Sequence, residues 1–170
     1  MAKEIILITG GQRSGKSNYA QQTALSLSEN PVYLATSRIW DEEHQKRIER
    51  HKADRGTEWT NIEEEKQLSN HRLENRVVLV DCVTLWATNF FFDNNSDVDL
   101  SLAMIKDEFD KLIQQEAQFI FVSNEIGLGG TSENKAQRLF MDLQGWINQY
   151  IASKANKVYL MVSGIPIQVK

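Results

Sequence analysis

Short runs of apolar, often β-branched residues recur along the chain and are separated by longer stretches of mixed polarity. The runs with the length and composition of buried parallel strands are residues 4–9, 32–35, 76–81, 118–123 and 157–163. The stretches that place apolar residues near helical spacing are residues 17–28, 100–115 and 133–153. Strands that alternate with helices of this length predict right-handed βαβ units. We therefore expect an α/β fold, with a mostly parallel sheet and helices on both faces.

The length of 170 residues fits one globular domain covering residues 1–170. Two segments do not follow the alternation of strands and helices. Residues 38–75 are crowded with charge, and residues 93–99 form an Asn/Asp cluster that is typical of a surface loop. We find no internal repeat and no linker that would divide the chain.

A glycine-rich segment follows the first predicted strand and opens the first predicted helix, and it satisfies the pattern G-x-x-x-x-G-K-S/T of a phosphate-binding P-loop. Its residues are Gly10, Gly11, Gln12, Arg13, Ser14, Gly15, Lys16 and Ser17. Glycines allow backbone N–H groups to curl around phosphate oxygens, the lysine reaches the β and γ phosphates, and the hydroxyl of Ser17 is placed for Mg²⁺. Chance alone would give the four fixed positions in about one such chain in a hundred. The segment therefore predicts a P-loop that binds a nucleoside triphosphate.

Asp81 ends the strand predicted over residues 76–81. A carboxylate at the end of a buried strand is typical of the group that holds Mg²⁺ in P-loop enzymes. Strands of α/β proteins also end in aspartate because helix caps lie at the same edge. The P-loop favours the metal role for Asp81 over the capping role.

A charged stretch over residues 41–55 places Arg47, His51 and Arg55 on one helical face. By composition alone, a solvated helix laced with salt bridges is the favoured interpretation. The stretch nevertheless follows the strand 32–35, whose carboxyl end is expected on the same side as the P-loop. Neighbouring cations such as Arg50 and Lys52 disfavour the charged imidazole, so His51 is a candidate nucleophile for covalent nucleotidyl transfer.

Composition excludes several classes of function. The chain has 19 Lys and Arg against 23 Asp and Glu, a net charge of -4, so no global positive field attracts nucleic acid or anionic lipid. The longest aliphatic runs are far shorter than the roughly 20 residues that span a bilayer, and no segment resembles a secretory signal. Cys82 is the single cysteine, which excludes an internal disulfide and cysteine-based zinc sites. We expect a cytoplasmic protein without an integral membrane segment.

Several segments taken together resemble one enzyme family. They are the P-loop at residues 9–17, Y-L-A-T-S at 33–37, R-I-E-R-H-K at 47–52, W-T-N-I-E at 59–63, S-N-E-I-G-L-G at 123–129 and V-S-G-I-P at 162–166. In combination they look like the bifunctional adenosylcobinamide kinase / adenosylcobinamide-phosphate guanylyltransferase of cobalamin synthesis. The resemblance covers essentially the whole chain.

The resemblance implies a P-loop enzyme that assembles as a homotrimer and acts twice on a corrinoid. It phosphorylates adenosylcobinamide with ATP or GTP, then passes GMP from GTP to the new phosphate through a covalent GMP-histidine intermediate. By position, His51 is the histidine that carries GMP. The residues that the resemblance places against nucleotide or its metal, beyond the P-loop, are Ala35, Thr36, Ser37, Lys52, Ala53, Asp54, Arg55, Glu63 and Asp81. Some relatives have glutamate at the position of Asp81, so a contact of Asp81 with metal or with guanine stays open.

Two other functions compete with this interpretation. A plain P-loop kinase of a small metabolite would use the phosphate loop and leave His51 structural. A regulatory GTP-binding switch is weaker, because the chain has no N-K-x-D guanine motif. Multiple turnover with a corrinoid acceptor separates the bifunctional enzyme from both.

Overall fold

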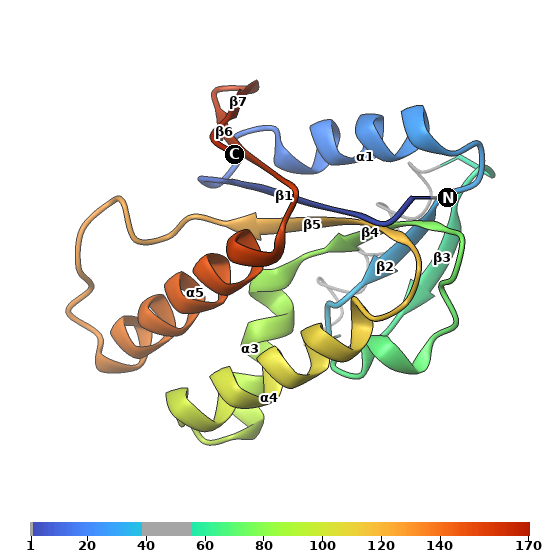
Figure 1. The fold of residues 1–170 in the computed structure, drawn as a ribbon. Helices are drawn as coiled ribbons and strands as arrows, with labels where there is room; N and C mark the ends of the chain where they lie inside the picture. The colour runs from blue at the N-terminus through green and yellow to red at the C-terminus, as the bar shows by residue number, and fades with distance from the viewer. Residues whose placement is uncertain (1, 39–55) are drawn as a thin grey trace.

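The computed structural model describes residues 2–38 and 56–170 (Figure 1). Its strands are β1 (Glu4–Gly10), β2 (Val32–Ala35), β3 (Thr60–Glu63), β4 (Val77–Asp81), β5 (Gln118–Asn124), β6 (Lys157–Val162) and β7 (Ile165–Gln168). Its helices are α1 (Lys16–Leu27), the short 3₁₀ helix η1 (Leu68–Asn70), α3 (Val83–Asp93), α4 (Val98–Leu112) and α5 (Lys135–Lys154). The five predicted strands and three predicted helices are confirmed, with ends displaced by a few residues.

The strands form one sheet in the order β3-β2-β4-β5-β1-β6-β7. All neighbouring pairs are parallel except β6 and β7, which form an antiparallel hairpin at the edge. Helix α1 covers one face of the sheet, and α3, α4 and α5 cover the other (Figure 1). The predicted α/β class, with a mostly parallel sheet and helices on both faces, is confirmed.

Side chains that alternate along each strand divide the core between these two faces. On β1, Ile6 and Ile8 pack with Ala20 and Ala24 of α1. Ile5 and Leu7 belong to the larger cluster formed with α3, α4 and α5. Because both faces are buried, the central strands are apolar along their whole length, and this made them visible in the sequence.

Besides the single turn of η1, the sequence did not predict three elements. Strand β3 lies within the charged segment 38–75, and its residues are only half-buried or exposed, so it has no continuous apolar run. Helix α3 is rich in aromatic and other apolar residues around its circumference, so it lacks an amphipathic stripe. Strand β7 is exposed at every position and contains Pro166, which is tolerated at a sheet edge.

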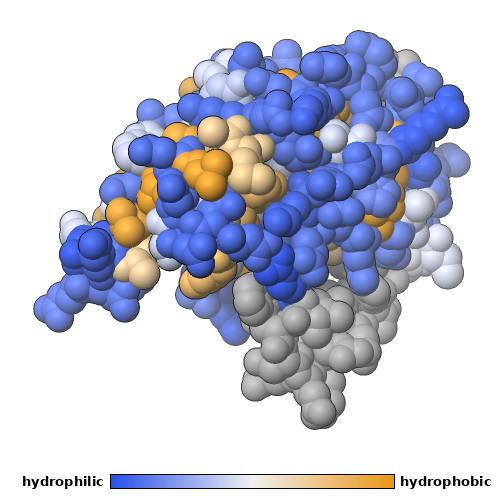
Figure 2. Space-filling view, turned by 90° about the horizontal axis from the view of Figure 1, so that it is seen from below, coloured by the Kyte–Doolittle hydropathy of each residue, from blue (hydrophilic) through white to orange (hydrophobic). Residues whose placement is uncertain are grey.

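The face formed by α3, α4 and α5 is seen from below in Figure 2, where hydrophilic side chains surround a smaller hydrophobic area. Large apolar side chains exposed at the end of α3 and on the first half of α4 are those of Phe92, Leu100 and Met104. No helix in the described part of the chain combines the length and the apolar character needed to cross a membrane.

Candidate active site

The predicted P-loop connects β1 to α1, so its strand-loop-helix setting is confirmed. Gly10 and Gly15 both have positive φ, of 154° and 93°. A Cβ atom at Gly10 would lie 2.7 Å from the carbonyl oxygen of Met161, and one at Gly15 would lie 3.1 Å from Cα of Gly164. Glycine is therefore required at both positions by conformation and by close backbone contact. Gly15 caps α1 without a side-chain hydrogen bond, which leaves the first N–H groups of the helix available to an anion.

Lys16 is the first residue of α1, and its side chain turns back over the loop. The ammonium group donates to the carbonyl oxygen of Gly11 at 2.5 Å and to the hydroxyl of Ser14 at 3.5 Å. Burial lowers the pKa of Lys16, and the nearby thiol of Cys82 and carboxylate of Asp81 partly oppose that shift. Phosphate oxygens would be stronger partners for this ammonium than the neutral groups that it contacts in the structure.

The other residues of the loop are mostly open to solvent. Gly11, Gln12, Arg13 and Ser17 are exposed, whereas Ser14 is buried. Arg13 has a positive φ of 55°, as expected for a tightly curved loop. The exposed hydroxyl of Ser17 makes no hydrogen bond within residues 2–38 and 56–170.

The sheet register brings three of the predicted site residues into one row. Ala35 pairs with Glu63 of β3 on one side and with Asp81 of β4 on the other. All three lie at the carboxyl ends of their strands, on the edge of the sheet where the P-loop follows β1. Parallel α/β sheets bind ligands at this edge.

Thr36 and Ser37 follow β2 at the same edge but differ in their surroundings. Thr36 is fully buried. Its hydroxyl donates to the carbonyl of Cys82 at 2.7 Å and accepts from the N–H of Cys82 at 2.9 Å. Asn89 donates to the carbonyl of Thr36 at 2.8 Å. Ser37 is half-buried, and its hydroxyl contacts the carbonyl of Arg38 at 3.4 Å. The side chain of Thr36 is thus used to join β2 to the start of α3.

A tyrosine on the neighbouring strand orients the carboxylate of Asp81. The hydroxyl of Tyr33 donates to Oδ2 of Asp81 at 2.6 Å. This bond leaves Oδ1 of Asp81 without a hydrogen bond to any residue of the described ranges. The sequence reasoning missed Tyr33, because the contact depends on the pairing of β2 with β4, whose register places Tyr33 and Asp81 on one face.

Ser17 and Asp81 provide oxygen donors that fit Mg²⁺. This ion is bound in nucleotide sites by one or two protein oxygens, with phosphate and water oxygens completing its shell. The free Oδ1 of Asp81 and the exposed hydroxyl of Ser17 suit that arrangement. The Tyr33 bond is the kind of outer-shell contact that orients a metal-binding carboxylate.

The predicted nucleophile lies outside the described residues. His51 and the neighbouring predicted contacts Lys52, Ala53, Asp54 and Arg55 all belong to the segment 39–55, which the structure does not describe.

The turn of the β6–β7 hairpin is a further contact of the P-loop that sequence reasoning missed. The N–H of Gly164 donates to the carbonyl of Ser14 at 2.9 Å. Ser163 and Gly164 both have positive φ, as in the tight turns that favour hairpins. The V-S-G-I-P block at residues 162–166 therefore supports the phosphate loop from the side opposite β4.

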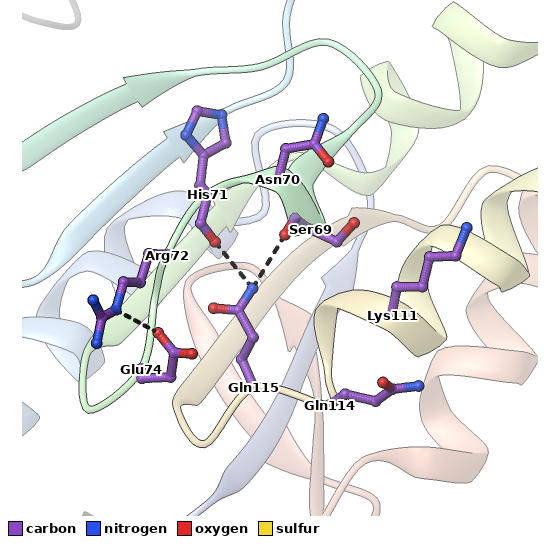
Figure 3. Close-up of a pocket in the computed structure, with 8 residues that line it drawn as sticks. All are labelled: Ser69, Asn70, His71, Arg72, Glu74, Lys111, Gln114 and Gln115. Atoms are coloured by element: carbon purple, nitrogen blue, oxygen red, sulfur yellow. Dashed lines mark hydrogen bonds and ion pairs between the residues drawn. The ribbon is translucent and has the colours of Figure 1, made fainter.

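A second polar region lies at the other end of the sheet (Figure 3). The pocket is lined by Ser69, Asn70, His71, Arg72, Glu74, Lys111, Gln114 and Gln115. These residues precede β4 and β5, so the pocket lies at the amino ends of these strands. Figure 3 shows Gln115 pointing between Ser69 and His71, and its amide donates to both of their backbone carbonyls.

Comparisons with known proteins connect this site to one enzyme family. The model of the family described as cobinamide kinase / cobinamide phosphate guanyltransferase matches residues 6–169. The bifunctional adenosylcobalamin biosynthesis protein CobU of Escherichia coli is 39% identical, and the match covers 98% of this chain and 99% of the relative. The protein of the same name from Salmonella typhimurium is 35% identical over the same shares of both chains.

Similarity to solved structures supports the fold at much lower identity. An ATPase of a bacterial type III secretion system superposes with a TM-score of 0.58 and 11% identity, covering 92% of this chain and 50% of the other. The P4 protein of bacteriophage phi6, solved with ADP, gives a TM-score of 0.51 and 12% identity, covering 96% and 52%. At such identities the likeness concerns the fold alone.

Proposed function

Since this chain belongs to the cobinamide kinase / cobinamide phosphate guanyltransferase family, we propose that it phosphorylates adenosylcobinamide and then guanylylates the product. It is a bifunctional transferase of cobalamin biosynthesis. The observation that carries the proposal is the match of the family model across residues 6–169, in a chain that has a P-loop between β1 and α1.

In the first reaction, the hydroxyl oxygen of adenosylcobinamide attacks the γ-phosphorus of ATP or GTP. The bond from that phosphorus to the β–γ bridging oxygen breaks, and the nucleoside diphosphate leaves. Lys16 and the free N–H groups at the start of α1 stabilise the negative charge on the phosphates. Mg²⁺ held by Ser17 and Asp81 would supply further neutralisation of the β and γ phosphates.

In the second reaction, His51 is the nucleophile. A nitrogen of its neutral imidazole attacks the α-phosphorus of GTP, and pyrophosphate leaves. A phosphate oxygen of adenosylcobinamide phosphate then attacks the same phosphorus, the N–P bond breaks, and adenosylcobinamide-GDP is released with free His51. Nucleotidyl transfer through the enzyme requires such a nucleophile, whereas direct phosphorylation of the corrinoid hydroxyl does not.

Further nucleotide contacts are proposed along the edge that carries Asp81. Ala35, Ser37 and Glu63 lie beside it at the carboxyl ends of β2 and β3 or directly after them. The segment 52–55 and the P-loop complete the proposed set. Thr36 supports this edge by its hydrogen bonds to Cys82, and any nucleotide contact of Thr36 would have to use other atoms.

We also propose that residues 1–170 form one domain and that three copies assemble. The exposed apolar side chains of Phe92, Leu100 and Met104 are consistent with a surface that another chain covers. Sedimentation equilibrium should give three times the chain mass of 19.5 kDa. A monomer at micromolar concentration would contradict the trimer while leaving the chemistry untouched.

Labelled GTP tests the two reactions separately. Wild-type protein incubated with α-labelled GTP should acquire acid-labile, base-stable label, as expected of a phosphoramidate. His51→Ala should lose this label and the formation of adenosylcobinamide-GDP, yet still transfer label from γ-labelled nucleotide to adenosylcobinamide. His44→Ala, a second histidine of the same charged stretch, is the matched control and should behave as wild type. Label that persists in His51→Ala would contradict the assignment of His51 as the nucleophile.

A further inference from the structure

The tip of β5 lies between the two parts of the proposed kinase site. Strand β5 pairs with β1 on one side and with β4 on the other. Asn124, its last residue, is opposite Gly10, the first residue of the P-loop. Asp81 is opposite Val122, two residues earlier on β5. Asn124 therefore stands at the carboxyl edge of the sheet, flanked by the phosphate loop and the proposed metal ligand.

Strand alternation gives the direction of the Asn124 side chain. Ser123 faces α5, because its hydroxyl contacts Asn148 of that helix. Val122 belongs to the core cluster on the α1 face. Asn124 has the same parity as Val122, so its side chain is on the α1 face. Asp81 is on this face too, because it bonds Tyr33 of the same cluster.

The backbone around Asn124 is held from three directions. Its N–H donates to the hydroxyl of Thr84 at 3.0 Å, and its carbonyl accepts from the amide of Asn148 at 3.1 Å. The N–H of Glu125 donates to the carbonyl of Gly10 at 2.9 Å. In contrast, the half-buried side-chain amide of Asn124 makes no hydrogen bond to any residue within 2–38 or 56–170.

A buried polar network beneath α5 explains how this tip is fixed. Gln144 is fully buried, and its amide donates to the hydroxyl of Ser123 and to Oδ1 of Asn148, both at 2.9 Å. The hydroxyl of Ser123 also donates to Oδ1 of Asn148 at 2.5 Å. Buried polar groups are costly unless they are hydrogen-bonded, and in this network Oε1 of Gln144 is the atom without a partner among the described residues. The network ends on the carbonyl of Asn124.

We propose that the side-chain NH₂ of Asn124 donates a hydrogen bond to an oxygen of the transferred γ-phosphoryl group, and that Asn148 positions it. The inference rests on the proposed kinase function. Asn124 neither gains nor loses a proton. The hydroxyl oxygen of adenosylcobinamide forms the new bond to the γ-phosphorus, and the bond from that phosphorus to the β–γ bridging oxygen breaks. The proton of the hydroxyl passes to water. A neutral donor whose backbone is held beside the P-loop and Asp81 would stabilise charge that develops during transfer.

Three single variants test the contact. Asn124→Ala should lower kcat for phosphorylation of adenosylcobinamide by about 100-fold, the loss typical of one preorganised donor. The Kd for ATP, measured by calorimetry, should change less than about 3-fold, because the loop that binds ground-state phosphates is intact. Asn124→Asp, which replaces the donor by a negative acceptor, should be at least as slow. Asn70→Ala, in the pocket at the other end of the sheet, should retain wild-type kcat.

A double variant tests the positioning role of Asn148. Asn148→Ala should lower kcat by about 10-fold, as expected when a supporting contact is lost. If Asn148 acts through Asn124, the double variant should be no slower than Asn124→Ala alone. If Asn148 has only a structural role, the losses in kcat of the two single variants should multiply in the double variant. The kcat of Asn148→Ala should then fall in proportion to the fraction of protein that is unfolded at the assay temperature.

The outcomes distinguish the two proposals. Absence of corrinoid phosphorylation by the wild-type protein would overturn the proposed function and this inference with it. Wild-type turnover with an Asn124→Ala kcat within twofold of it would overturn the inference alone. Multiplicative losses in the double variant would overturn the positioning role of Asn148.

Discussion

The two ends of the central sheet both expose polar side chains, but they use them differently. At the amino end, Gln115 accepts from the N–H of Leu73 at 2.7 Å and donates to the carbonyl of His71 at 3.0 Å. Glu108 accepts there from the N–H of Ser69 at 2.7 Å. These side chains satisfy backbone groups of the loop that leads into β4. At the carboxyl end, the hydroxyl of Ser17 and the side-chain amide of Asn124 make no hydrogen bond to any residue of the described ranges.

This contrast separates polarity that supports the fold from polarity available to a ligand. Buried backbone groups that lack a ladder partner must find a side chain, and the amino-end residues supply it. At the carboxyl end, Thr36, Thr84 and Asn148 hold backbone groups, which leaves Lys16 and its neighbours to meet phosphate. The comparison predicts that variants at the two ends change different quantities: turnover at the carboxyl end, stability at the amino end.

The largest effect is expected for Lys16→Ala. Positioning and charge stabilisation provide nearly all of phosphoryl-transfer catalysis, so kcat/KM for the kinase reaction should fall by about 1,000-fold or more. Lys111→Ala, at the edge of the amino-end pocket, is the matched control and should keep wild-type turnover. Both are measured by label transfer from γ-labelled ATP to adenosylcobinamide. Near-normal turnover of Lys16→Ala would contradict the proposal that the P-loop holds the phosphates during transfer.

The next largest effect concerns Mg²⁺ and the pair formed by Tyr33 and Asp81. Asp81→Asn keeps the shape but removes the charge, and the Mg²⁺ concentration for half-maximal nucleotide binding should rise by about 100-fold. Tyr33→Phe removes the 2.6 Å hydrogen bond to Asp81 and should raise this Mg²⁺ concentration by about 10-fold. Calorimetric titration of nucleotide at a series of Mg²⁺ concentrations measures both without relying on turnover. Unchanged Mg²⁺ dependence in Asp81→Asn would reassign its carboxylate to capping or to a contact with guanine.

Features that arise from residues close together in the chain could be predicted from the sequence, whereas contacts between distant residues could not. The P-loop was identified from the sequence because its glycines, Lys16 and Ser17 are neighbours in the chain, and the central strands were identified because both of their faces are buried. The half-exposed strand β3 and the aromatic helix α3 have no such periodic signal.

Contacts between distant segments could not be derived from sequence pattern. Tyr33 and Asp81 are 48 positions apart, and the turn at Gly164 reaches Ser14 from the far end of the chain. Each depends on the strand order of the sheet, which residue periodicity does not give. The sequence did predict Asp81 as a site residue, because the strand that carries it ends there, but its partner needed the fold.

A smaller effect, on stability alone, is expected at the amino end. Gln115→Ala leaves the N–H of Leu73 and two loop carbonyls without their partner, which should lower the free energy of unfolding by about 1–2 kcal/mol. The kinase kcat of the folded variant should equal that of the wild type. Gln114→Ala, an exposed neighbour in the same pocket, is the control and should leave the urea midpoint unchanged. A fall in kcat without a fall in stability would show that the amino-end pocket takes part in function.

The smallest effect is expected where charges at the carboxyl end neutralise one another. Arg38, which follows β2, binds both carboxylate oxygens of Asp93 at 2.9 and 3.0 Å, and Lys66 contacts the same carboxylate at 2.7 Å. The hydrogen bonds from Arg38 and Lys66 hold the pKa of Asp93 well below its ordinary value. The resulting stability is present above the unfolded pKa of about 4 and is lost as the pH falls from there toward the lower folded pKa.

Asp93→Asn should therefore reduce the free energy of unfolding at pH 7 by at most about 1 kcal/mol, since the group is partly exposed and screened by solvent. The difference from wild type should shrink as the pH falls below about 4, because the unfolded carboxylate takes up its proton there while the folded carboxylate, with its lower pKa, stays ionised. Urea unfolding at pH 7, 5 and 3 measures it, and 0.5 M salt should reduce the pH 7 difference because screening weakens partly exposed ion pairs. A difference that stays constant across this range would mean that Asp93 stabilises the chain through packing rather than charge. In that case, the ion pairs of Asp93 would not be an example of charge that stabilises the fold, and they could not be compared with Lys16, whose charge faces phosphate.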